Sequence, residues 1–254
     1  MLTKTEIHLR LPDGACFSQA PSLFVYRRIL QIIQRISCLQ TGSRCNECPL
    51  HSSCRYDWIT GHHFQKYPGI LCPADPFEKR KYSPGEELVI TILWIGTAEM
   101  YKSAAEIALD EMKQSIQGIF FYNKKISHST VSETPEQMSE LRLKTPVRLP
   151  EQTDLSENEL VSLFEEMNDW YQSSYGCTFL FSPEDNLSKT GQSSSSLSCS
   201  IGSVILPTKV LRLNGITGTQ TFSDPVTLSS VWKQIGIGAT NCIGGGAFET
   251  DHTI

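Results

Sequence analysis

The first half of the chain alternates between segments that predict strands and segments that predict helices. Apolar residues at Ile7, Leu9 and Leu11 alternate with polar ones and predict a half-buried strand over 5–11. An apolar stripe with helical spacing covers 22–36. A β-branched strand over 87–97, a helix over 98–114 and a strand over 118–124 complete the unit. The β-α-β-β order in this half is that of half of a ferredoxin-like α+β unit.

The second half of the chain repeats the pattern. It predicts strands over 141–149, 177–181, 204–213, 217–222 and 247–250, and helices over 156–173 and 225–233. The polar segment 127–139 predicts an interdomain linker. We therefore expect an α+β protein with two tandem ferredoxin-like (RRM-like) domains, residues 1–126 and 140–254, and a Cys-rich insertion in the first at about 38–72.

Composition indicates an ordinary globular protein, with 254 residues, 39% hydrophobic and 19% charged. No apolar run approaches the ~20 residues that a membrane helix needs. The first residues, MLTKTE, lack the apolar core of a signal peptide. We therefore expect a cytoplasmic protein with no membrane partner.

The formal net charge of −5 argues against a nucleic-acid partner, because neutralising phosphates requires Lys and Arg. The distribution weakens this objection. Residues 151–169 hold a cluster of Asp and Glu with no Lys or Arg, and the rest of the chain is slightly basic. A basic groove elsewhere in the molecule therefore stays compatible with the charge.

Nine cysteines, an odd number, do not predict a disulfide framework. Cys45, Cys48 and Cys54 are spaced so that thiolates could converge on one structural zinc ion. Cys38, Cys72 or His51 could supply the fourth ligand. We include Cys38 in the predicted set of zinc ligands. The alternative is that these cysteines are small buried packing residues.

Five glycines stand close together near the carboxyl end, at Gly236, Gly238, Gly244, Gly245 and Gly246. The segment lacks the Gly-Lys-Ser/Thr ending of a P-loop. It resembles the glycine-rich loop of the RAMP superfamily of CRISPR proteins, in particular the repeat-RNA endoribonucleases of the Cas-six family. Further stretches resemble that family in the same order along the chain, at 45–56 (a Cys knuckle found in one branch), 67–71, 83–88, 96–98, 141–149 and 215–218.

The resemblance implies a fold, an activity and partners. Such enzymes need no cofactor for catalysis: a ribose 2′-OH attacks the adjacent phosphate and leaves a 2′,3′-cyclic phosphate. The partners would be a repeat or guide RNA and the subunits of a CRISPR effector complex, in a prokaryotic cytoplasm. Backbone amides of the glycine-rich loop would lie against the RNA. The residues expected to hold it are Arg27, Arg28, Arg142, Lys144, Arg148, Lys233, Gly236, Gly238, Gly244, Gly245 and Gly246.

Histidine suits the required acid and base because its ordinary pKa lies near neutrality. Among six histidines, the pair His62-His63 lies in a loop expected to be irregular, with a lysine nearby, and is our candidate acid/base. Tyr26, next to two arginines on the first helix, is a candidate for orienting the phosphate. The alternatives are a solvated histidine pair, or a tyrosine–arginine site that works without histidine.

Strand alternation places Arg142, Lys144 and Arg148 on one side of the strand predicted over 141–149, facing either RNA or solvent. Three functions remain open. The first is the endoribonuclease, and the second is a non-catalytic RAMP subunit that binds and caps guide RNA. Leu30-Gln31, standing where the family often carries Gly-His, favours the second. The third is a zinc-binding scaffold without an RNA role.

Overall fold

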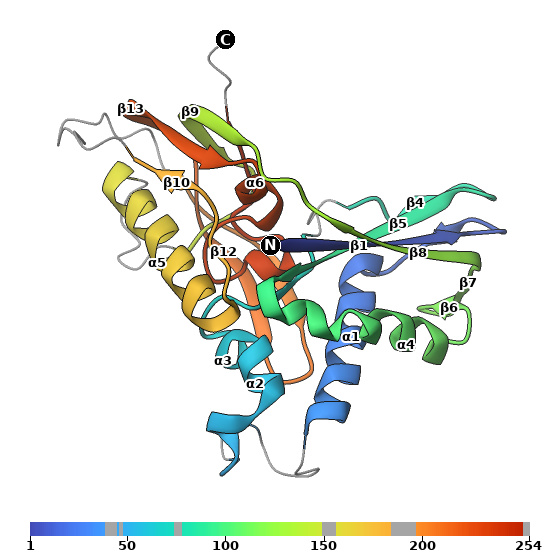
Figure 1. Ribbon diagram of the computed structural model, residues 1–254. Coiled ribbons are helices and arrows are strands. Elements are labelled where there is room, and N and C mark those ends of the chain that lie inside the picture. The colour runs from blue at the N-terminus through green and yellow to red at the C-terminus, as the bar shows by residue number, and fades with distance from the viewer. Residues whose placement is uncertain (39–44, 46–47, 74–77, 149–155, 184–196, 251–254) are drawn as a thin grey trace.

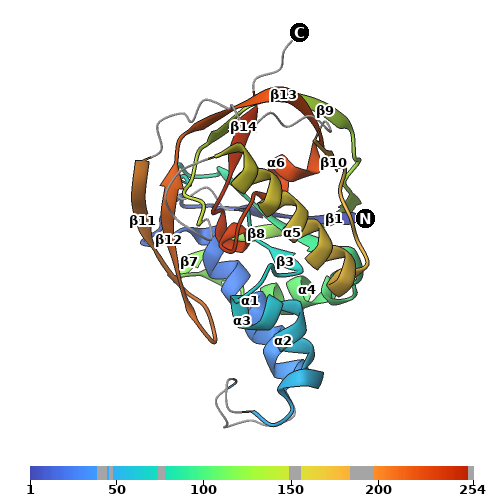
Figure 2. The same cartoon turned by 90° about the vertical axis from the view of Figure 1, so that its left-hand side faces the viewer.

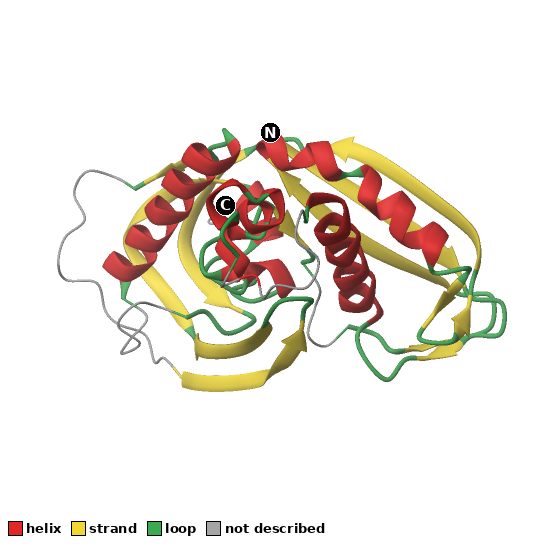
Figure 3. Cartoon of the chain, turned by 90° about the horizontal axis from the view of Figure 1, so that it is seen from below, coloured by secondary structure: helices red, strands yellow, loops and turns green. Residues whose placement is uncertain are grey.

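A computed structural model describes residues 1–38, 45, 48–73, 78–148, 156–183 and 197–250 (Figure 1). The chain forms two four-stranded antiparallel sheets that lie side by side, each with its own helices (Figures 1 and 3). Among the described residues, no helix is both long and apolar enough to span a membrane.

The first sheet has the strand order β3-β5-β1-β8. Its strands are β1 (Leu2–Arg10), β3 (Ile70–Leu71), β5 (Glu87–Ile95) and β8 (Tyr122–Thr130). α1 (Pro21–Ser37) and α4 (Ser103–Glu111) pack together over one face, and the 3-10 helix η3 (Gly96–Tyr101) follows β5 (Figure 1). Two short ribbons lie beside the sheet, β2 (Ala15–Cys16) with β4 (Lys81–Tyr82) and β6 (Ser115–Ile116) with β7 (Ile119–Phe120).

The second sheet has the order β10-β13-β9-β14. Its strands are β9 (Pro135–Leu143), β10 (Phe181–Ser182), β13 (Thr219–Ser229) and β14 (Phe248–Thr250). Its helices are α5 (Glu157–Tyr175), α6 (Val231–Ile235) and the 3-10 helix η4 (Asn241–Ile243). A separate hairpin of β11 (Leu197–Ile205) and β12 (Val210–Thr217) extends away from this sheet (Figure 2).

The expected fold class is confirmed. Each sheet follows the ferredoxin-like order, in which the first and third strands of a βαββαβ unit lie in the centre. The central strands are β1 and β5 in the first sheet and β9 and β13 in the second. α5 begins with a capping box, in which Ser156 and Glu159 satisfy each other's backbone N–H, and ends at Gly176 in the left-handed conformation. Its Phe164 stacks on Phe181 of β10 at 4.6 Å between ring centroids, which joins helix to sheet.

The insertion after α1 is more regular than predicted. It contains η2 (His51–Ser53), α2 (Arg55–Ile59) and α3 (Gly61–Phe64), and β3 at its end belongs to the first sheet. Trp58 donates its indole N–H to the Ser174 carbonyl at 3.0 Å, and the Trp170 indole donates to the Tyr67 carbonyl at 2.8 Å. The insertion therefore ties the first half of the chain to α5.

Most of the linker predicted over 127–139 forms strands instead. Residues up to Thr130 continue β8, which pairs with β1, and β9 already begins at Pro135. β8 is an outer strand with many exposed side chains, so its polar composition does not show apolar alternation. Only 131–134 connect the two sheets.

Several other element boundaries differ from the prediction, and the strand predicted over 204–213 contains the turn between β11 and β12. The strand predicted over 141–149 ends at Leu143, because Thr145 and Pro146 turn the chain toward the glycine-rich segment. The helix predicted over 225–233 is mostly the end of β13, and α6 begins only at Val231. Pro225 lies where the pairing of β13 with β9 shifts its register. A proline is tolerated there because its missing N–H interrupts no ladder hydrogen bond.

Candidate nucleic-acid interface

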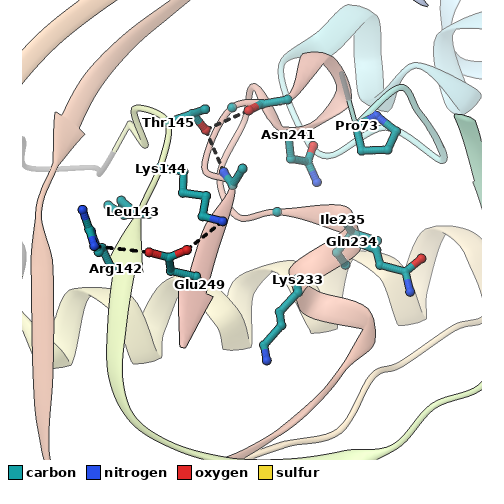
Figure 4. Close-up of a pocket in the computed structure, with 14 residues that line it drawn as sticks. Pro73, Arg142, Leu143, Lys144, Thr145, Lys233, Gln234, Ile235, Asn241 and Glu249 are labelled. Atoms are coloured by element: carbon teal, nitrogen blue, oxygen red, sulfur yellow. Dashed lines mark hydrogen bonds and ion pairs between the residues drawn. The ribbon is translucent and has the colours of Figure 1, made fainter. Parts of the chain in front are cut away.

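Two cavities lie on either side of the glycine-rich segment 236–246. The first, called here the Arg142 pocket, has a volume of about 540 Å³ and is bordered by β9, α6 and β14 (Figure 4). The second, the Arg212 pocket, has a volume of about 710 Å³ and lies between the β11–β12 hairpin and Phe64 of α3. Gly236, Gly244 and Gly245 line the first, and Ala239 and Thr240 line the second.

The Arg142 pocket carries three cations and one carboxylate. Lys144 Nζ lies 2.7 Å and Arg142 Nη1 3.4 Å from the carboxylate oxygens of Glu249. The hydrogen bond from Lys144 lowers the pKa of Glu249 below its ordinary value, and the charges of both cations add to this effect. Lys233 pairs at 2.5 Å with Glu136, which lies outside the pocket lining. The cations are therefore held in place but stay accessible.

The Arg212 pocket is more strongly positive. Arg148, Lys209 and Arg212 line it, and the described lining contains no carboxylate. Within the described part of the chain, none of these three side chains forms an ion pair, and Lys209 Nζ donates to the Phe64 carbonyl at 3.4 Å. Three exposed like charges on one surface repel one another, so an anionic ligand would be favoured there.

Residues 144–148 join the two pockets. Lys144 and Thr145 line the first pocket and Arg148 lines the second. Arg142, Lys144 and Arg148 are exposed, as predicted, but strand alternation does not extend past β9, because Thr145, Pro146 and Val147 are buried in succession. Leu149, also predicted to face inward, lies outside the described residues. The basic side chains thus form one surface across two cavities.

The expectation that glycine amides face an RNA strand is wrong. The N–H groups of all five glycines donate within the protein. Gly236 donates to the Trp232 carbonyl and Gly244 to the Asn241 carbonyl. Gly245 donates to the Thr240 carbonyl and Gly246 to the Pro146 carbonyl. Gly238 donates to Met167 Sδ. The segment is buried except near Ala239, so its amides serve the fold.

The glycines allow close packing instead. Gly246 has a φ of +62°, and a Cβ there would lie 1.8 Å from the Ile237 carbonyl oxygen. A Cβ on Gly245 would lie 2.1 Å from Thr240 Oγ1. These close approaches let the chain fold back on itself between the two pockets. The glycine-rich segment thus positions the basic side chains around it.

The prediction that Tyr26 orients the phosphate is wrong. Its side chain is completely buried in α1, and its hydroxyl donates to the Ile70 carbonyl at 2.8 Å. Burial raises its pKa well above the ordinary value. The helical stripe that predicted α1 also carries Tyr26 into the core, where it cannot reach a ligand.

Arg27 and Arg28 lie apart from both pockets. Arg28 is 2.9 Å from Glu111 of α4 and also donates to Gln31, so it joins two helices. Arg27 lines a smaller cavity of about 280 Å³ together with Arg80 and the β11 strand. The structure therefore does not bring these two predicted RNA contacts together with Arg142, Lys144, Arg148 and Lys233.

His62 and His63 share one buried carboxylate. His62 Nδ1 lies 2.7 Å from Asp57 Oδ2, and His63 Nε2 lies 3.2 Å from Asp57 Oδ1. The side chain of His62 is 48% exposed and that of His63 is 12% exposed, whereas that of Asp57 is 2% exposed. His62 is thus the member of the pair that a ligand can reach, and the carboxylate fixes its ring.

The backbone at this pair is unusual. His62, His63 and Phe64 all have left-handed φ values of 50°, 51° and 62°. Non-glycine residues rarely adopt this conformation in succession, because it brings Cβ close to the following carbonyl oxygen. Strain of this kind is often kept at functional sites. It places Phe64 in the wall of the Arg212 pocket, two residues beyond His62.

The predicted zinc ligands lie around the end of α1. Burial raises the pKa of the Cys45 thiol, and the neighbouring Cys38, Cys54 and Cys48 add to this shift. However, no three Cys, His, Asp or Glu side chains of the described chain are arranged to hold one metal ion. The zinc site therefore stays a prediction from the cysteine spacing, and we derive no role for the metal.

Sequence reasoning missed several residues of this interface. Lys209 and Arg212 belong to a hairpin whose strands were placed differently, and Asp57 stands in a segment expected to be irregular. Asn241 carries no charge and lies between glycines. The alternation of Leu211, Arg212 and Leu213 was the one signal that could have placed Arg212 on an exposed face.

Comparison with known proteins places this arrangement in a known fold. A solved Cas6 product complex is similar over 98% of this chain and 99% of its own, with 11% identity and a TM-score of 0.50. A RAMP protein binding different RNA substrates has 12% identity and a TM-score of 0.47, covering 99% of this chain and 100% of its own. A Cas6-related protein from Pyrococcus furiosus has 12% identity and a TM-score of 0.47, with both chains covered fully.

The chain has a fold of two ferredoxin-like domains, and it is similar in fold to the Cas6 protein of that product complex. The family model AF_1859_N, described as an N-terminal domain, matches residues 28–155, half of the chain, and the chain belongs to this family. No curated protein sequence matches the chain.

Proposed function

We propose that this protein binds RNA across the glycine-rich segment, with the phosphates in the Arg142 and Arg212 pockets. The observation that carries the proposal is the cluster of Arg148, Lys209 and Arg212, which forms no ion pair with a described residue and faces a cavity with no described carboxylate in its lining. Phosphates neutralise such clusters and release counterions, which drives RNA binding. A groove of this kind holds an RNA stem by shape and phosphate contacts.

The wider task is CRISPR RNA processing. The Cas6 protein of similar fold was solved as a product complex, which supports an RNA-processing role for the fold. The RNA would be a repeat or guide RNA, and the product would stay bound within a CRISPR effector complex. The mixed charges of the Arg142 pocket, with Glu249 beside its cations, fit a site that releases phosphates more readily than the Arg212 pocket.

For cleavage, we propose His62 as the general acid/base, with His63 completing the pair. The 2′ oxygen of one ribose forms a bond to the adjacent phosphorus, and the bond from phosphorus to the leaving 5′ oxygen breaks. The 2′-OH proton goes to a base such as His62, and an acid protonates the 5′ oxygen. Asp57 Oδ2, 2.7 Å from His62 Nδ1, holds the His62 ring in its orientation. The products are a 2′,3′-cyclic phosphate and a 5′-OH.

The second candidate is a RAMP subunit that binds and caps guide RNA without cutting it. The burial of Tyr26, a predicted phosphate-orienting residue, favours this alternative. In that case Asp57, His62 and His63 stabilise the turn that shapes the wall of the Arg212 pocket. RNA binding is common to both candidates, and only cleavage separates them.

The test uses a labelled RNA hairpin of the CRISPR repeat type, incubated with the full chain in EDTA. Cleavage that leaves a 2′,3′-cyclic end supports the endoribonuclease. His62→Ala should then lower the rate about 100-fold or more. His8→Ala is the matched control, because His8 also lies beside a carboxylate, that of Glu87 at 3.4 Å, but on the first sheet.

Each other outcome has a defined meaning. A shifted but intact hairpin supports the capping subunit and excludes His62 as a catalytic residue. Equal cleavage by wild type and His62→Ala also overturns the role of His62. No shift even at low salt overturns RNA binding itself and leaves a scaffold.

A further inference from the structure

Asn241 holds a buried hydrogen-bond acceptor that the protein does not use. The residue is 1% exposed and begins η4 within the glycine-rich segment. Its Nδ2 donates to the Tyr171 hydroxyl at 2.8 Å. Its Oδ1 is buried and accepts no hydrogen bond from any described residue. Buried side-chain carbonyls nearly always have a partner, so an unused one calls for an explanation.

The unused oxygen belongs to a residue that lines the Arg142 pocket. Figure 4 shows the Asn241 amide extending into the space bordered by Pro73 and Ile235. Lys144 and Arg142 stand on another side of the same cavity, near Glu249. The pocket therefore combines an apolar wall, a buried acceptor and nearby cations. Its volume of about 540 Å³ is ample for one nucleotide.

We propose that the Arg142 pocket takes one nucleotide of the bound RNA and selects a base with an exocyclic amine. The amine of cytosine, adenine or guanine donates to Asn241 Oδ1, and the adjacent phosphate lies against Lys144 or Arg142. This inference rests on the proposed RNA binding and adds base selection to it. Uracil is disfavoured because it has no amine and presents a carbonyl to the Asn241 oxygen.

The orientation of the amide supports this assignment. Tyr171 is completely buried, and its hydroxyl lies 2.8 Å from the Asn241 amide nitrogen. That hydroxyl accepts the Asn241 Nδ2–H, which leaves Oδ1 as the atom for the ligand. The backbone N–H of Asn241 is engaged by the Gly238 carbonyl, so the turn itself is fixed.

The first experiment compares the wild-type chain with ten-nucleotide oligo(C) and oligo(U) in a fluorescence binding assay. We expect oligo(C) to bind about fivefold more tightly, as one neutral hydrogen bond implies. Oligo(N4,N4-dimethylcytidine) has no N–H to donate and should bind like oligo(U). Equal binding of all three, or tighter binding of oligo(U), would overturn the proposal without any variant protein.

A second experiment uses Asn241→Leu, which removes the acceptor and keeps the volume. The variant should bind oligo(C) and oligo(U) equally, with the oligo(U) affinity of the wild type retained. Gln172→Leu is the matched control, since Gln172 is exposed on α5, lines neither pocket and should leave the preference unchanged. A preference that survives in Asn241→Leu would exclude Asn241 as its source.

The two proposals fail in different ways. If the wild type binds none of the oligonucleotides at low salt, RNA binding is wrong and base selection falls with it. If it binds all of them without preference, RNA binding stands and base selection by Asn241 is wrong.

Discussion

Thr145 and Gly244 meet at the centre of the interface, although 99 residues separate them in the chain. The Thr145 hydroxyl donates to the Gly244 carbonyl at 2.7 Å and accepts the N–H of Ala247 at 2.8 Å. The buried Thr145 side chain thus joins the turn after β9 to Gly244 and Ala247, which precede β14. Because Lys144 precedes Thr145, the same bonds position a cation of the Arg142 pocket.

Thr145→Val should destabilise the protein by about 1–3 kcal/mol, because it leaves the buried Gly244 carbonyl and Ala247 N–H without partners. Urea unfolding followed by circular dichroism measures the change. Thr221→Val serves as the control, since Thr221 is exposed on β13. Equal stability of the two variants would show that the buried bonds do not hold the turn.

Gly246→Ala should cost about 3 kcal/mol or more. The added Cβ meets the Ile237 carbonyl and must also adopt a left-handed φ. Gly176→Ala has nearly the same φ, +63°, but no atom within 4 Å of the new Cβ, so it should cost only about 1–2 kcal/mol. The difference between the two unfolding free energies isolates the close approach. If both variants lose the same stability, the packing role of Gly246 is wrong.

Glu249→Gln should strengthen RNA binding about threefold to tenfold, because the carboxylate competes with phosphate for Lys144 and Arg142. Glu86→Gln removes a similarly paired carboxylate that faces Lys79, outside both pockets, and should leave RNA affinity unchanged. A filter-binding assay with one hairpin RNA compares them. Weaker binding by Glu249→Gln would contradict the competition.

The same pair has a defined pH dependence. The pKa of Glu249 is lowered in the folded protein, mainly by the hydrogen bond from Lys144. A lowered pKa adds stability above the unfolded value of about 4.5, and this stability is lost as the pH falls through the lower folded pKa. Glu249→Gln should therefore flatten the loss of stability below about pH 4.5, and an unchanged acid unfolding curve would contradict the pairing.

The cysteine spacing predicts one zinc ion per chain, held by Cys45, Cys48 and Cys54 with Cys38. The Cys45 thiol lies near enough to Cys38, Cys54 and Cys48 for their charges to raise its pKa, although the described side chains form no group of three arranged around one ion. Metal content by mass spectrometry of the purified protein tests the prediction, with Cys48→Ser expected to lose the ion. Cys199→Ser, which changes a cysteine of β11, should retain it. A wild type without zinc would leave the thiols as packing residues.

The sequence predicted the parts of the fold where local pattern and tertiary contacts agree. The alternation of Ile7 and Leu9 and the stripe of α1 follow directly from burial of one face. The strand predicted over 118–124 includes only the start of β8, and the rest was missed because an outer strand has little apolar alternation to detect and the polar residues of 127–130 resemble a linker.

The interface was only partly predictable, for a physical reason. Exposed charges on a strand such as Arg142 and Lys144 follow from alternation alone. Contacts such as that of Asn241 with Tyr171 depend on chain segments 70 residues apart, and no local pattern encodes them. The role of the glycines was misjudged because a need for close packing and a need for exposed amides select the same residue.

The central claim is that RNA phosphates lie against Arg148, Lys209 and Arg212. The variant that replaces all three with Ala removes these contacts. A control variant with Arg10, Lys81 and Lys125 replaced by Ala loses the same charge from residues that line neither pocket.

The most direct measurement is the salt dependence of hairpin RNA affinity for the wild type and these two variants. The slope of log affinity against log salt should become shallower by about 2 to 3 in the pocket variant. The variant contacts fewer phosphates, so its binding releases fewer counterions. The control variant should keep the wild-type slope. Equal slopes for the wild type and the pocket variant would contradict the account.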